Sequence, residues 1–202
     1  MEENIQKIRE IPIGTVVIAG LNAAVYLVLM LLGNTENAAF MAYHGAMYPE
    51  FVIVDGEWWR VITAMFLHFN PGHLVNNMLI FCCIGSRLEK VTGTIRMLLV
   101  YFLSGIFGNL LSLYVMCRTG NFAVSAGASG AVYGMIGAFL WVLILYRGQL
   151  EDISLRGILI MLGLSLYYGV TTTNIDNWCH LGGLVSGFLL MIILYHRKRQ
   201  KC

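Results

Sequence analysis

The chain has 202 residues, of which 58% are hydrophobic and 12% are charged, and its formal net charge is +2. Its mean hydropathy is +0.72, and a soluble domain of this size usually carries about twice this charged fraction. These values exclude an ordinary soluble domain. The small net charge gives no indication of nucleic-acid binding, so we expect no nucleic-acid partner.

Apolar runs of roughly 20 residues recur along the chain, each long enough to cross a hydrocarbon core about 30 Å thick. The sequence therefore predicts an all-α membrane protein. We expect six membrane helices, over residues 11–32, 73–86, 97–116, 129–146, 155–168 and 178–195.

The segments around these helices complete the predicted organisation. Residues 1–10 are expected to form a short cytoplasmic N-terminus, residues 11–196 a single six-helix domain, and residues 197–202 a basic cytoplasmic tail. No Ala-x-Ala site follows the first apolar run at a suitable distance, so we expect no cleavable signal peptide. Residues 33–57 mix aromatic and methionine residues with polar ones, which suits an irregular segment at the headgroup boundary.

The basic residues are distributed asymmetrically between the two sides of the predicted bundle. Six spans place both termini on one side, and every Lys and Arg except Arg60 and Arg118 falls on that side. The positive-inside rule then places both termini in the cytoplasm. We expect a multi-pass protein of a bacterial cytoplasmic membrane, whose tail contacts lipid headgroups.

The five cysteines are an odd number and do not indicate a disulfide framework. Cys117 and Cys179 fall on the same side of the membrane, which leaves a bond between them open. The preferred interpretation is that all five cysteines are small apolar fillers.

Polar side chains within the predicted spans are functional candidates, because they are costly in a bilayer. His73 and Asn77 are four residues apart and share one helix face. Three polar residues lie 17 or 18 positions from a basic residue that closes their helix: Ser129 from Arg147, His180 from Arg197, and His73 from Lys90. At 1.5 Å per residue, all three lie roughly 25 Å above the cytoplasmic face, at one level.

Glycines at small-xxx-small spacing accompany two of these polar residues and predict close helix approach. They are Gly127, Gly130, Gly134 and Gly137 near Ser129, and Gly183 and Gly187 after His180. Plain helix packing is the alternative interpretation. A site is favoured because each series begins beside a polar residue.

Serine becomes a nucleophile when a neighbouring base takes its proton, and neutral histidine is the usual base near pH 7. We therefore expect Ser129 and His180 to form a catalytic pair. His73, Asn77 and the backbone N–H of Ser129 are the expected donors to an oxyanion. The expected orienting group for the imidazole is Tyr133, whereas Asp176 is expected to cap the last helix at the surface.

Other protease mechanisms lack their residues in this chain. There is no His-Glu-x-x-His string for a metalloprotease. His68 is five residues from His73 and is expected to turn away from it, so we expect no metal. The aspartates fall in predicted loops, which excludes an intramembrane aspartyl protease, and Ala131 occupies the place of the second glycine of a soluble hydrolase's nucleophile elbow.

Four motifs together resemble the rhomboid family of intramembrane serine proteases. They are Gly127-Ala128-Ser129-Gly130, the set His68…His73-x-x-x-Asn77, Trp59-Arg60 and His180-x-x-Gly183-x-x-x-Gly187. The resemblance covers helices one to six. It implies a rhomboid-like bundle with a membrane-embedded first loop that contains Trp59 and Arg60, and a Ser–His dyad with the oxyanion donors named above. It also implies that Tyr133 lies beneath the histidine and that Glu89 is a buried polar group.

The same resemblance implies cleavage of single-span membrane proteins in or near their transmembrane segment, without a cofactor. The soluble domain of some members is expected to be absent, and Leu166-Tyr167-Tyr168 match no assigned motif. A non-catalytic rhomboid-like binder stays open as the alternative, whereas a transporter would be expected to show an internal repeat. Residues 119–128 are expected to enter the outer leaflet of the membrane as irregular chain. Gly127 and Ala128 are expected to line the bottom of an active site that water can reach.

Overall fold

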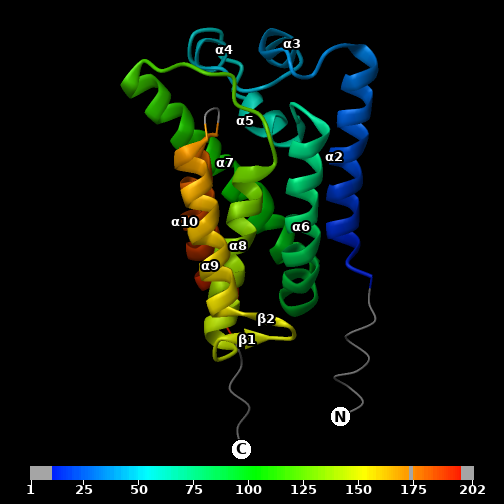
Figure 1. Cartoon of the computed structure of the whole chain (residues 1–202), viewed down its shortest axis with the longest axis vertical. Coiled ribbons are helices and arrows are strands. Elements are labelled where there is room, and N and C mark those ends of the chain that lie inside the picture. Colours follow the sequence, from blue (N-terminus) through cyan, green and yellow to red (C-terminus); the bar gives the residue numbers. More distant parts are fainter. Residues whose placement is uncertain (1–10, 173–174, 197–202) are drawn as a thin grey trace, which may run out of the picture.

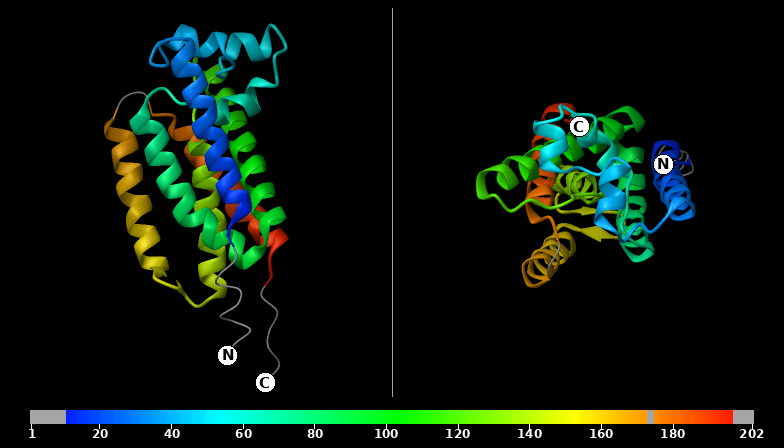
Figure 2. Two further views of the ribbon diagram at one scale, coloured as in Figure 1. Left: turned by 90° about the vertical axis from the view of Figure 1, so that its right-hand side faces the viewer. Right: turned by 90° about the horizontal axis from the view of Figure 1, so that it is seen from above.

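A computed structural model describes residues 11–172 and 175–196. Its long helices alternate in direction along one axis (Figure 1). They are α2 (Ile13–Leu32), α6 (Pro71–Thr92), α7 (Thr94–Thr119), α8 (Ser129–Leu145), α9 (Leu155–Thr171) and α10 (Asn177–Leu194). The start of α2 and the end of α10 therefore lie at the same end of the bundle (Figure 2).

Helix α8 occupies the centre of the bundle. It is apolar on all sides, which is typical of a helix enclosed by others, and every residue from Gly130 to Phe139 is buried. Helices α7 and α10 pack directly against it (Figure 2). Helix α9 lies at the periphery and buries only Ile158, Leu162 and Gly169.

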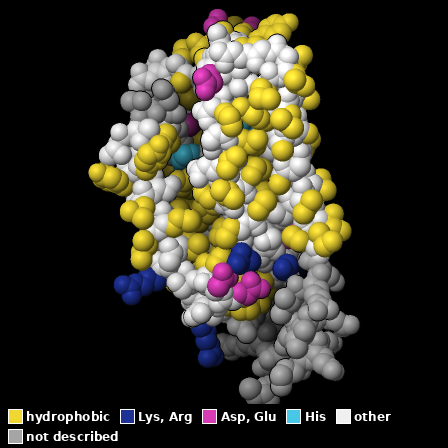
Figure 3. All heavy atoms as spheres, turned by 45° about the vertical axis from the view of Figure 1, so that its right-hand side comes forward, with side chains coloured by type: hydrophobic (Ala, Val, Ile, Leu, Met, Phe, Trp, Pro, Cys, Tyr) yellow, Lys and Arg dark blue, Asp and Glu magenta, His cyan; other side chains and the backbone are white. Residues whose placement is uncertain are grey.

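The outer surface of the bundle is apolar. Helices α2, α7 and α10 are long and apolar enough to cross a membrane, and α8 and α9 are shorter apolar helices. Hydrophobic side chains cover the middle of the face shown in Figure 3, and basic side chains gather near its lower end. A surface of this kind fits an integral membrane protein. The exact number of spans stays a prediction.

The segments between the long helices contain more structure than the sequence indicates. Three short helices precede α6, namely α3 (Ala38–Tyr43), α4 (Pro49–Ile53) and α5 (Arg60–Thr63), followed by a 3-10 turn over Ala64–Phe66. The prediction of an irregular segment over 33–57 was therefore wrong in part. Local caps explain the helices, because the Asn37 side chain accepts from the Phe40 N–H and Pro49 begins α4.

A two-stranded hairpin of β1 (Gln149–Leu150) and β2 (Ile153–Ser154) joins α8 to α9 and was not predicted. Gln149 pairs with Ser154 and Leu150 with Ile153 in antiparallel register. The Arg87 guanidinium donates to Asp152 Oδ1 at 2.7 Å, which ties α6 to the hairpin. This hydrogen bond holds the pKa of the exposed Asp152 carboxyl below its usual value.

Helices α6 and α7 extend beyond their predicted bounds of 73–86 and 97–116. Helix α6 can continue past residue 86 because the Glu89 side chain is buried and hydrogen-bonded within the fold. Its carboxylate accepts from the Gly14 and Thr15 N–H groups, at 2.8 Å each, and from the Thr15 and Thr94 hydroxyls, at 2.7 and 2.8 Å. Glu89 thus joins the start of α2 to the α6–α7 corner, as the resemblance implied for a buried polar group. The predicted terminal segments, 1–10 and 197–202, lie outside the described residues.

Helices α8 and α10 approach so closely that their backbones touch, as the glycine spacing predicts. A methyl group at Gly183 would overlap the Gly130 carbonyl, and one at Gly187 would overlap the Gly134 carbonyl. On the other side of α8, a methyl group at Gly134 would collide with the Ser104 side chain. No side chain fits between these helices.

The helix contact leads to a first prediction. Gly187→Ala should destabilise the protein by about 1–3 kcal/mol, because the added methyl has no space and the backbones must separate. The matched control is Gly20→Ala in α2, where no atom of the described residues lies within 4 Å of the added methyl. Its thermal unfolding midpoint should stay unchanged or rise slightly. Thermal unfolding in detergent measures both, and equal midpoints for the two variants would contradict the prediction.

Candidate active site

Ser129 is the first residue of α8 and follows an irregular segment over residues 120–128. The segment is held by hydrogen bonds between Ser125 and Met47, at 2.8 and 2.9 Å, and by the Gly127 N–H, which donates to the Ala64 carbonyl at 2.9 Å. Residues 120–128 are irregular, as expected, whereas Thr119 still belongs to α7. The descent of this segment into the membrane stays a prediction. The hydroxyl of Ser129 therefore stands at a helix N-terminus, where backbone N–H groups have no partner within the helix.

His180 lies in the first turn of α10, and its Nε2 atom is 2.9 Å from Ser129 Oγ. Both residues are half-buried. They meet because each lies in the first turn of its helix, at the end where α8 and α10 pack closely against each other at their glycines. The structure thus places the two predicted residues within hydrogen-bond distance of each other, and a neutral histidine beside a serine hydroxyl is an arrangement that can activate serine.

Tyr133 stacks on the imidazole of His180, with ring centroids 4.2 Å apart and planes at 9°. Its hydroxyl is hydrogen-bonded to the Ser165 hydroxyl on α9. Tyr133 thus lies beneath the histidine, as the resemblance implied, and also links it to the peripheral helix. Ser165 was missed by sequence reasoning, although a lone polar residue in the apolar run of α9 was the available signal.

His73 and Asn77 approach the loop before Ser129 from α6. A methyl group on Gly127, whose φ is +142°, would lie 2.7 and 2.8 Å from His73 Cε1 and Nε2 and 3.8 Å from Asn77 Nδ2. Glycine is therefore required here by both backbone and space. Asn77 Nδ2 is buried and has no hydrogen-bond partner among the described residues, so within this part of the chain the amide is a free donor beside the loop.

The position of His68 differs from the expectation that its side chain turns away from His73. It lies before α6 rather than on it, and it is fully buried with its ring 5.0 Å from that of His73. Its Nε2 atom accepts from the Ala128 N–H at 3.5 Å. The expectation that His68 turns away was wrong, because that argument assumed a continuous helix from His68 to His73, whereas α6 begins only at Pro71.

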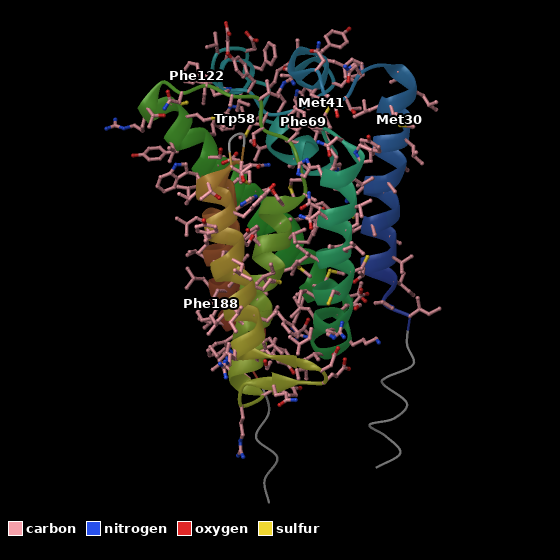
Figure 4. The ribbon with its side chains drawn as sticks, in the orientation of Figure 1. Met30, Met41, Trp58, Phe69, Phe122 and Phe188 are labelled. Carbon is pink, nitrogen blue, oxygen red and sulfur yellow. The ribbon has the colours of Figure 1, made fainter. Side chains whose placement is uncertain are left out.

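Arg60 and Trp59 lie further from the Ser–His pair. Arg60 is buried, and its Nη1 atom donates to the carbonyls of Ala42 and Ala46, the latter at 3.0 Å. Trp59 is half exposed. Figure 4 shows Trp58, Phe69 and Phe122 at this same end of the bundle. Arg60 therefore ties the end of α3 to the segment after it and does not touch the dyad.

Cys179 is buried beside His180, and its thiol donates to Asn109 Oδ1 at 3.2 Å. Asn109 in turn donates to the Val61 carbonyl at 2.8 Å, which links α10 to α7 and α5. Cys179 and the exposed Cys117 are both free thiols, so they are not paired here. The interpretation of Cys179 as a small apolar filler was incomplete, because its thiol is hydrogen-bonded.

The fold and site define a helical membrane protein that holds a Ser–His pair between two glycine-packed helices. A family profile described as the Rhomboid domain matches residues 55–197. The chain therefore belongs to the Rhomboid family, whose members are generally intramembrane serine proteases.

Three relatives illustrate the similarity. Rhomboid protease GluP of Bacillus subtilis (strain 168) is 33% identical over 177 residues, covering 88% of this chain and 34% of GluP. RHOMBOID-like protein 6, mitochondrial, of Arabidopsis thaliana is 38% identical over 154 residues, covering 74% of this chain and 48% of the relative. Putative rhomboid protease YdcA of Bacillus subtilis is 35% identical over 151 residues, covering 74% and 73%. The chain thus spans a third to a half of the length of the first two relatives.

The contact between Tyr133 and Ser165 leads to a second prediction. Tyr133→Phe keeps the stacked ring and removes the hydroxyl, so Ser129 should react with a fluorophosphonate about 3- to 10-fold more slowly, because a hydrogen bond that fixes the ring is worth about 1 kcal/mol. Ser165→Ala should match it, and the double variant should show no further loss. The control is Tyr167→Phe, which removes a hydroxyl from an exposed side chain of α9. Additive losses in the double variant would contradict the link.

Proposed function

We propose that this chain is a serine endopeptidase that hydrolyses a peptide bond in or near the transmembrane segment of membrane-protein substrates, through a dyad of Ser129 and His180. The observation that carries the proposal is the 2.9 Å separation between Ser129 Oγ and His180 Nε2. Membership of the Rhomboid family supports it. So do the names of relatives described as rhomboid proteases.

The proposed reaction follows from the positions of these side chains. Neutral His180 takes the proton from Ser129 Oγ while that oxygen attacks the scissile carbonyl carbon. The resulting imidazolium gives the proton to the leaving amine, which leaves an acyl group on Ser129. Water, deprotonated by His180, then hydrolyses this ester. Tyr133 holds the imidazole plane throughout by stacking.

The tetrahedral intermediate carries a negative oxygen that requires hydrogen-bond donors. His73, Asn77 and the Ser129 N–H are the proposed donors, and Gly127 leaves the space among them. The unpaired amide of Asn77 supports this role, because a buried donor without a partner is costly unless a ligand uses it. The α8 N-terminus adds the positive end of its dipole.

The membrane setting is part of the proposal. Six spans, with both termini in the cytoplasm of a bacterium, would place Ser129 roughly 25 Å above the cytoplasmic face. Irregular backbone at that depth is tolerated where it lines a cavity that holds water. Residues 120–128 are irregular, and they are proposed to line such a cavity. The proposed substrates are single-span membrane proteins, and all the proposed chemistry is supplied by side chains and water without a cofactor.

The decisive experiment labels detergent-solubilised protein with a fluorophosphonate probe. The wild type should be labelled and should cut a test transmembrane substrate, whereas Ser129→Ala and His180→Ala should both lose activity by about 10³-fold or more. His44→Ala is the control, because His44 lies at the end of α3 and contacts Phe40 rather than the dyad.

The outcomes separate the alternatives. An unlabelled wild type that cuts no substrate would favour the non-catalytic binder. Labelling that survives Ser129→Ala would refute the assignment of the nucleophile.

The oxyanion donors lead to a further prediction. Asn77→Ala should lower kcat by about 10²- to 10³-fold and change KM little, because the donor acts on charge that develops only in the transition state. The control is Asn76→Ala, an exposed amide next to it on α6. A rise in KM with unchanged kcat would show that Asn77 binds substrate instead.

A further inference from the structure

Asp176 is the N-cap of α10, as the sequence predicts, but its carboxylate does more than cap. Oδ1 accepts from the Cys179 N–H at 3.0 Å. Oδ2 accepts from the Ser112 hydroxyl at 2.6 Å and from the Ser125 hydroxyl at 2.7 Å. One half-buried carboxylate thus joins α10, α7 and the loop that leads into α8.

Ser125 and Asp176 lie at equivalent positions before the two residues of the dyad. Ser125 precedes Ser129 by four residues, and Asp176 precedes His180 by four residues. The bond between Ser125 and Asp176 is therefore a second cross-link between the two segments that carry the dyad. The main-chain carbonyl of Asp176 also accepts from the His180 N–H at 3.2 Å, which begins the helical bonding of α10.

A cap alone does not explain the two serine contacts. An N-cap needs one oxygen for the N–H groups of its own helix, and Oδ1 serves this purpose. Hydrogen bonds to an ionised acceptor are about twice as strong as neutral ones, so Oδ2 holds both hydroxyls firmly. Ser125 is itself bonded through its backbone to Met47, so the loop is fixed on two sides just before the nucleophile.

We propose that Asp176 is a positioning residue that holds the Ser129 loop and the His180 helix in register for reaction. The proposal rests on the proposed function of Ser129 and His180. Asp176 does not touch the reacting atoms. Its effect is to keep Ser129 Oγ and His180 Nε2 within hydrogen-bond distance while substrate binds and leaves, because small displacements of a dyad reduce the reaction rate strongly.

The test measures fluorophosphonate labelling of the full chain in detergent, with the maximal labelling rate separated from the probe concentration at half-saturation. Asp176→Asn retains an oxygen for the Cys179 N–H, and Ser125→Ala removes only the loop contact. Each should lower the maximal rate about 10-fold without changing half-saturation. The thermal midpoint should stay unchanged in Ser125→Ala, whereas in Asp176→Asn it should fall about as far as in Ser112→Ala, because the Ser112 contact is lost there too. The double variant should be no slower than either single one, because both break the same link.

Two controls separate positioning from stability. Ser186→Ala removes a hydroxyl of α10 that donates to the Gly182 and Gly183 carbonyls of its own helix, and it should label at the wild-type rate. Ser112→Ala removes the α7 contact, and it should lower the thermal midpoint more than the labelling rate, since α7 carries no dyad residue.

The outcomes decide the inference separately from the function. If the wild type is labelled and the maximal rate is unchanged in Ser125→Ala and Asp176→Asn, the positioning role is overturned and the protease proposal stands. Losses that track the thermal midpoint across all variants would likewise overturn it and assign Asp176 a structural role alone. An unlabelled wild type would refute the proposed function itself.

Discussion

The contact between α8 and α10 is the constraint on which the rest of the structure depends. Gly130 and Gly134 of α8 face Gly183 and Gly187 of α10 so closely that no Cβ atom fits between them. Small residues allow such an approach in membranes, where packing rather than the hydrophobic effect holds helices together. Because the site is built at one end of this rigid pair, the separation of its polar groups is set by backbone contact rather than by flexible side chains.

The loops at that end are held by polar contacts to backbone groups. Arg60 binds one carbonyl within α3 and one after it, and Asp176 joins three segments. At the other end of the bundle, Glu89 caps the start of α2. This pattern fits a membrane protein, since backbone groups that water does not reach must find partners within the chain. Helix α9 differs, because it buries little surface, and the Tyr133–Ser165 contact ties its middle to the site.

Much of the candidate site could be predicted because its evidence is local. Counting from basic residues placed Ser129 and His180 at one level, and glycine spacing brought their helices together. The argument failed at His68, where it assumed helical spacing across Asn70 and Pro71, a cap and a helix-starting proline that begin α6 anew. It also missed the short helices before α6 and the hairpin at residues 149–154, because elements of two to six residues carry too little periodicity to be recognised.

The sequence by itself determined the helical membrane class and the family resemblance, and it predicted the Ser129–His180 pair. These depend on hydropathy, on spacing within one helix and on motifs of a few residues. Only the tertiary structure decided that Ser165 reaches Tyr133, that His68 lies against His73, and that Asp176 binds two serines. The physical reason is that the Ser165 and Asp176 contacts join residues 32, 51 and 64 positions apart that no motif links, whereas the His68 contact depends on where the chain turns into α6. Neither separation nor turn geometry is encoded in the pattern of any single helix.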